Sequence, residues 1–256
     1  MVVDSPWHRV AGCIRTKSTL GKLRKPWELS STFGKYKEWL IPVDPAAGED
    51  MLPQTTKGGG AFGFKGDDIV PYEEIRFDPS VQVGTDGTAV DALYPILARA
   101  VWAAVQYNEA ARQWQGVAGP VPPHRPQWAS EAEQLAPQHA AARGARKMVT
   151  DCMAVYLAGV QHPSKHIAPT RVHAGTWRTI RTYGGALDNL DKVQAHQGVP
   201  EQPISKEEWD IVINDKADSW AKRANEEHIV PAQIADDYRM GLWACKKVFV
   251  WRWANC

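Results

Sequence analysis

The chain has 256 residues, of which 44% are hydrophobic and 23% charged, as is typical of a soluble globular protein. Its formal net charge of +1 favours neither a generally basic nucleic-acid binder nor an acidic tail protein. No apolar run reaches the roughly eighteen residues that a membrane-spanning helix needs, and the N-terminus lacks the apolar core of a secretory signal. The four cysteines are too scattered for a disulfide scaffold or a zinc ribbon, so we expect an intracellular protein with reduced thiols.

Residues 1–90 are predicted to form an extended, loop-rich arm, and residues 91–256 a helical body with an aromatic tail. The arm is basic over 1–40 and acidic over 41–91, and Pro and Gly interrupt both stretches. Such a segment buries too little apolar surface on itself to offset its ordering entropy, so we expect another surface to hold it. Its basic start also overlaps the mitochondrial transit signature, which makes a mitochondrial location one candidate. Gly58, Gly60 and Gly63 match a G-x-G-x-x-G spacing but lack the flanking strand and helix, which indicates a loop.

The body is predicted to be mainly α, an irregular bundle of about five to six helices. The first helix begins near Asp91 and ends by Gly116, because its apolar residues occur on every face, as in a central helix. A short helix follows from Ser130 to Pro137, and the next one starts at Pro137 and carries an apolar stripe over 145–159. Further helical stripes cover approximately 176–193, 205–230 and 231–249. The last residues, 250–253, are expected to form a short strand or an apolar plug.

Two capping boxes support this assignment. Ser130 with Glu133, and Ser205 with Glu208, each match the S-x-x-E pattern that marks a helix N-terminus. Pro137 is expected to interrupt the first of these helices and to start the next one.

Tryptophans outside the predicted helices are candidates for partner binding. A large aromatic ring is costly to expose, so such residues anchor extended segments onto apolar pockets. The candidates are Trp7, Trp27, Trp39, Trp251 and Trp253.

A basic patch near Trp177 is the candidate phosphate-binding surface. Arg171, Arg178 and Arg181 lie close together in the sequence, and arginines beside an aromatic ring can bind a nucleic-acid backbone. A solvated helix face is the more common explanation of such a pattern.

A cysteine–histidine group offers a possible metal or catalytic site. Cys152, His162, His166 and His173 have the right ligand types, but their spacing matches no known zinc pattern, and Cys152 lies on an apolar stripe. The sequence therefore predicts no catalytic residue, no cofactor and no metal.

These observations favour a non-catalytic structural or accessory subunit of a large intracellular multi-protein assembly, with a mitochondrial complex as one candidate. Its partners would be other protein subunits, bound through the arm and the tryptophans. The first alternative is a virion coat or nucleoprotein subunit that binds nucleic acid through its arginines. The second is an enzyme with a Cys/His site around Cys152 and His162.

Overall fold

The computed structural model describes residues 60–94, 97–123, 125–160, 163–183, 189–195, 197–228 and 230–254. They belong to two compact units: Thr55–Ile229, and a second that combines Met1–Gln54 with Val230–Cys256. In the second unit the described element is one helix, α10 (Ala232–Ala254). The predicted anchors Trp7, Trp27 and Trp39 lie outside the described residues, as do the side chains of Trp251 and Trp253.

The unit Thr55–Ile229 is built on a mixed seven-stranded sheet. Its strands are β1 (Phe62–Lys65), β2 (Asp68–Pro71), β3 (Gln82–Val90), β4 (Arg99–Asn108), β5 (Gln113–Pro120), β6 (Lys147–Thr150) and β7 (Leu190–Lys192). They lie in the order β2-β1-β5-β4-β3-β6-β7. The pairs among β1 to β5 are antiparallel, whereas β6 is parallel to both β3 and β7. The chain therefore makes a crossover before it enters β6.

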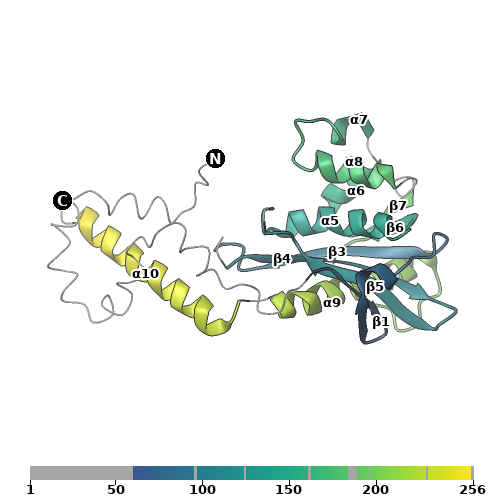
Figure 1. Cartoon of the computed structure of the whole chain (residues 1–256), viewed down its shortest axis with the longest axis horizontal. Coiled ribbons are helices and arrows are strands. Elements are labelled where there is room, and N and C mark those ends of the chain that lie inside the picture. Colours follow the sequence, from purple (N-terminus) through teal and green to yellow (C-terminus); the bar gives the residue numbers. More distant parts are fainter. Residues whose placement is uncertain are drawn as a thin grey trace. The chain divides into compact units, whose positions relative to one another are not determined.

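Helices cover both faces of this sheet (Figure 1). The helices of the unit are α5 (Ala129–Ala142), α6 (Met153–Val160), α7 (Pro163–His166), α8 (Ala174–Thr182) and α9 (Lys206–His228), with a short 3-10 turn at Tyr72–Glu74. Helices α5, α6 and α8 lie on one side of the sheet, and α9 lies on the other.

Strand β4 shows why the sheet has two cores. Ala100, Trp102 and Ala104 pack in the cluster that includes α5 and α8. Val101 and Val105 alternate with them and pack against α9. Because successive side chains of a strand point to opposite faces, a strand covered on both sides is apolar at every position.

The prediction of a mainly α fold is therefore wrong: the described fold is α/β. The segment predicted as a first helix from Asp91 to Gly116 forms β4 and the first half of β5 instead. Its all-round hydrophobicity is that of a doubly buried strand, which an apolar pattern alone does not separate from a buried helix. The end of the predicted arm contributes β1, β2 and β3 to the sheet, and the stripe expected over 145–159 divides into β6 and α6.

The later helices agree better with the sequence pattern. Helix α9 falls within its predicted segment, and α8 and α10 overlap theirs, although α8 starts two residues earlier, α10 extends to Ala254 and 190–192 is the strand β7. Residues 250–254 continue α10 and form neither a strand nor an irregular plug. Among the described residues, no helix combines the length and apolarity needed to cross a membrane.

The two capping boxes have opposite outcomes. At the start of α9 the box is confirmed: the Glu208 amide donates to Ser205 Oγ at 3.2 Å, and the Ser205 amide donates to Glu208 Oε2 at 3.3 Å. At the start of α5 it is wrong, because the N-cap residue is Trp128 and no side chain caps that end. Pro137 lies inside α5 and does not divide it.

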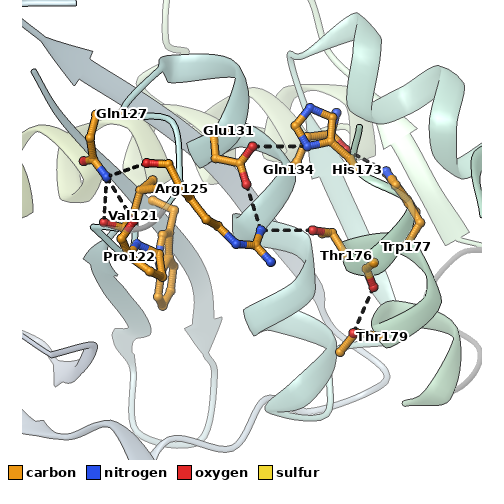
Figure 2. A network of polar contacts seen from close by, with 12 residues as sticks. Val121, Pro122, Arg125, Gln127, Glu131, Gln134, His173, Thr176, Trp177 and Thr179 are labelled. Atoms are coloured by element: carbon orange, nitrogen blue, oxygen red, sulfur yellow. Dashed lines mark hydrogen bonds and ion pairs between the residues drawn. The ribbon is translucent and has the colours of Figure 1, made fainter. Parts of the chain in front are cut away.

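A polar network fixes the start of α5 (Figure 2). Arg125, in the loop before the helix, donates to Glu131 Oε1 at 2.7 Å and to Thr176 Oγ1 of α8 at 3.2 Å. The other Glu131 oxygen lies 3.3 Å from His173 Nδ1. The buried Trp177 indole of α8 donates to Gln134 Oε1 of α5 at 2.7 Å. These contacts join α8, the loop and the first turns of α5.

Candidate active site

Two carboxylates come from neighbouring parallel strands. Asp86 lies in the middle of β3 and is only 5% exposed. Strand β6 pairs with β3 in a register that places Thr150 opposite Thr85. Asp151 follows Thr150 directly, so the register brings Asp151 beside Asp86 at the end of β6. The Thr85 hydroxyl donates to the Val149 carbonyl at 3.1 Å and reinforces this alignment.

A third carboxylate, Glu133, comes from α5, which approaches β3 at Gly87. A Cβ atom on Gly87 would lie 2.2 Å from the Glu133 amide nitrogen and 2.5 Å from the Ala132 carbonyl carbon. Only glycine permits such a contact between strand and helix. The missing side chain at position 87 therefore allows Glu133 to lie next to the preceding residue, Asp86.

The three side chains form one cluster. One carboxylate oxygen from each of Asp86, Glu133 and Asp151 lies within 4.8 Å of the others. Glu133 Oε2 is buried and has no hydrogen-bond partner. A buried carboxylate oxygen without a donor is unfavourable, so the cluster is poorly satisfied by the protein alone.

Burial and mutual repulsion raise the pKa values of this cluster. The pKa of Asp86 rises from 3.8 to about 7, first because of burial and then because of the charges of Asp151 and Asp218. The pKa of Glu133 lies well above its usual value, because of burial and then the charge of Asp86. Near neutral pH the cluster therefore needs either protons or an external cation.

Helix α9 supplies the opposite wall of the cavity. The cavity has a volume of about 420 Å³, and Asn214, Asp215, Asp218 and Lys222 of α9 line it together with the three clustered carboxylates. The helix comes close to the sheet because Gly84 leaves room: a Cβ there would lie 2.5 Å from the Ile213 carbonyl oxygen. Asn214 is therefore held against the strand that carries Asp86.

The donor set fits a divalent cation that prefers oxygen. Mg²⁺ and Mn²⁺ bind carboxylate, carbonyl and water oxygens, whereas zinc and copper prefer nitrogen or sulfur. Asp86, Glu133 and Asp151 supply carboxylate oxygens alone, and a cation would satisfy the orphaned Glu133 oxygen. The sequence predicted no metal site, and the clustered carboxylates now offer a candidate one.

The sequence-predicted Cys/His group is not assembled in the described structure. Cys152 lines the carboxylate cavity, with the pKa of its thiol raised mainly by burial. His173 instead pairs with Glu131 in the network at the start of α5. His162 lies outside the described residues. In the described part of the chain, the group of side chains that could hold a metal ion consists of acids.

The predicted arginine patch lies on and just before α8. Arg171 and Arg178 are exposed, and Arg181 is half-buried. Arg178 donates from Nε and Nη2 to the Ile167 carbonyl, at 3.0 and 2.6 Å, so part of its role is to hold the preceding loop. Phosphate binding by the three arginines remains a prediction.

Sequence reasoning missed the three acids that form the cluster, although two of them carry a signal. Asp86 is the only charged residue of β3, and Asp151 immediately follows the apolar residues of β6. An acid within or just after a buried strand is costly unless something compensates its charge, so it indicates a candidate site. Glu133 was assigned to a capping box, and no local pattern indicates its true position.

Comparisons with known proteins give only remote similarities. No family model and no curated protein matches the sequence. The chain is similar to the prototype foamy virus protease–reverse transcriptase, with 15% identity and a TM-score of 0.43 over 62% of this chain and 22% of that one. It is also similar to the PFV RNase H domain, with 16% identity and a TM-score of 0.36 over 56% and 94% of the two chains. RNase H1 from Halobacterium salinarum NRC-1 gives 16% identity and a TM-score of 0.35 over 57% and 98%.

These findings correct the functional predictions. The expectation of a non-catalytic structural subunit, and so of a protein that is not an enzyme, is wrong: an α/β domain brings three carboxylates together in a cavity. The seven-stranded sheet also contradicts the all-α description, and nothing in the described part of the chain supports the protein-subunit partners or a mitochondrial complex.

Proposed function

We propose that the chain is a nuclease that hydrolyses phosphodiester bonds with the help of divalent cations. The observation that carries this proposal is the cluster of Asp86, Glu133 and Asp151, with one oxygen of each within 4.8 Å of the others. Buried acids packed this closely destabilise the fold unless a cation compensates them. Phosphodiester hydrolysis is a reaction to which such a cation contributes directly.

Each residue of the cluster has a distinct part in this proposal. Asp86, the most buried, is fixed by the central strand and would be the common anchor for bound cations. Glu133 and Asp151 would complete the coordination from α5 and from the end of β6. A bound divalent cation would polarise the phosphate and lower the pKa of the attacking water. Asp218 faces the same cavity from α9 and would add a fourth carboxylate.

The segment that follows Asp151 favours a polyanionic substrate. From Cys152 to Leu187 the sequence contains no Asp or Glu, whereas Lys165, Arg171, Arg178 and Arg181 lie within it. A basic, acid-free segment joined directly to an acidic cluster would bind backbone phosphates while the cluster acts on one of them. We therefore propose a nucleic-acid strand as the substrate and the three arginines as contacts to its backbone.

The first experiment measures cleavage of labelled RNA/DNA hybrid, double-stranded RNA, double-stranded DNA and single-stranded RNA with Mg²⁺, Mn²⁺ or EDTA. We expect cleavage of at least one substrate with Mg²⁺ or Mn²⁺ and none with EDTA. Asp151→Asn should lower the rate at least about 100-fold. Asp68→Asn, which changes an exposed acid on β2, is the matched control and should leave the rate unchanged. Cleavage that persists in EDTA, or in Asp151→Asn, would refute the proposal.

A binding experiment tests the arginines. Binding is measured in Ca²⁺ in place of Mg²⁺, with the intact form of whichever substrate the first experiment shows to be cleaved. Arg171→Gln and Arg181→Gln should each weaken this binding and reduce the slope of log affinity against log salt by about 1. Arg76→Gln, a change on the loop after the 3-10 turn, serves as the charge-matched control. An unchanged slope in both α8-region variants would exclude these residues as phosphate contacts.

A further inference from the structure

Helix α9 presents three polar side chains to the cavity at intervals of one turn. Asn214, Asp218 and Lys222 all line the cavity, and residues four apart lie on the same helix face. Asn214 is 7% exposed, and its Oδ1 is buried without a hydrogen-bond partner. This face of α9 therefore holds a carboxylate and an unsatisfied carbonyl oxygen opposite the three clustered acids.

Lys222 already neutralises this wall. Its Nζ forms an ion pair with Asp218 Oδ2 at 2.5 Å. Its charge also reaches Asp86, whose pKa is raised by burial and by Asp151 and Asp218 but lowered by Lys222. The ammonium group thus acts as a cation attached to the edge of the acidic cluster.

A charge count shows how the Lys222 ammonium group and a second metal ion would compete for the same negative charge. Apart from Asp215, which also lines the cavity, Asp86, Glu133, Asp151 and Asp218 carry four negative charges when all are ionised. One divalent cation in the cluster leaves two, of which Lys222 compensates one. A second divalent cation would neutralise both, but it would have to take Asp218 from the lysine.

We propose that Lys222 competes with a second divalent cation for the α9 wall. The oxygen ligands of that cation would be Asp218, which is released when the lysine leaves, and Asn214 Oδ1, which already has no partner. The protein would then hold its first cation in the cluster at low metal concentration. The second would enter only when metal concentration, or a bound phosphate that attracts the ammonium group, displaces Lys222. This inference rests on the proposed function, because it requires a cation in the cluster of Asp86, Glu133 and Asp151.

The test measures Mn²⁺ binding to the full-length, substrate-free protein, by electron paramagnetic resonance of free Mn²⁺ and by isothermal titration calorimetry. The wild type should bind one ion tightly and a second weakly. Lys222→Met should tighten the second site about five- to tenfold, as expected for removing a competing charge from a partly exposed pair. Lys222→Arg keeps the charge and should resemble the wild type. The lysine side chain is 62% exposed, so neither variant should disturb folding.

Two further variants separate the possible failures. Asp218→Asn should weaken the second site in both the wild-type and Lys222→Met backgrounds, while Asp86→Asn should abolish the first. An unchanged or weaker second site in Lys222→Met, with the first site intact, would overturn the competition but leave the proposed nuclease standing. No Mn²⁺ binding to the wild type at all would overturn both.

Discussion

Replacing Asp86 by asparagine should stabilise the metal-free protein and abolish its response to Mg²⁺. The side chain keeps its shape but loses a charge that burial and Asp151 oppose. Because the folded-state pKa lies above the unfolded-state value, the folded protein binds more protons between about pH 4 and pH 7. The free energy of unfolding of the metal-free wild type should therefore fall as the pH rises through that window.

The magnitude follows from the pKa of Asp86. A rise from 3.8 to about 7 corresponds to ~4 kcal/mol above pH 7. Asparagine accepts a weaker hydrogen bond from the Gly87 amide than a carboxylate does, which offsets part of that gain. We expect a net stabilisation of roughly 2–3 kcal/mol at pH 8, or about 4–10 °C in Tm. At pH 5 the gain should be clearly smaller, because only the unfolded chain is ionised at this residue there, and below about pH 4 the variant should differ little from the wild type.

Thermal unfolding in EDTA at pH 5 and pH 8, repeated at pH 8 with Mg²⁺, checks this prediction. Mg²⁺ should raise the Tm of the wild type at pH 8 but not that of Asp86→Asn, which should also be inactive as a nuclease. The exposed Asp68→Asn is the control and should follow the wild type at both pH values. If Asp86→Asn were no more stable than the wild type at pH 8 in EDTA, the clustered acids would not repel as inferred.

Three further substitutions test particular contacts. Gly87→Ala forces a Cβ against the Glu133 amide. Thermal unfolding should show a loss of stability of about 1–3 kcal/mol, and the cleavage rate should fall. Gly175→Ala is the control: its Cβ meets no atom within 4 Å, so stability and cleavage should both stay unchanged. Trp177→Phe removes the indole donor to Gln134, and urea unfolding should report a loss of about 1–3 kcal/mol; a loss under 0.5 kcal/mol would mean that the bond contributes little. Ser205→Ala removes the cap of α9 and should lower stability by about 0.5–2 kcal/mol in the same assay, and an unchanged midpoint would contradict the capping role.

The parts of the fold that the sequence predicted are those set by local interactions. The box at Ser205 and Glu208 is complete within four residues, and α9 and α10 follow from their own periodicity. Strand β4 was predicted as a helix because its apolar residues occur at every position, which a buried helix and a strand buried on both faces have in common. Its structure depends on neighbours that are distant in the sequence.

The candidate site was hidden for the same reason. Asp86 and Asp151 meet only through the parallel pairing of β3 with β6, and Glu133 joins them only because Gly87 admits α5. None of these contacts leaves a periodic pattern. The spacing of Ser130 and Glu133 matches a capping box, so Glu133 was interpreted from local sequence alone. Its position in the structure depends on tertiary packing instead.

The parallel pairing of β3 with β6 also has a consequence for the folding pathway. Loop closure over the whole crossover must precede this pairing, and contacts of high sequence separation form slowly. The pairing of β6 with β3 brings Asp151 toward Asp86 and Glu133, so electrostatic repulsion among the three acids opposes it. A cation present during refolding would remove that repulsion, and the rate at which the crossover closes would then depend on the ionic content of the solution as well as on chain topology.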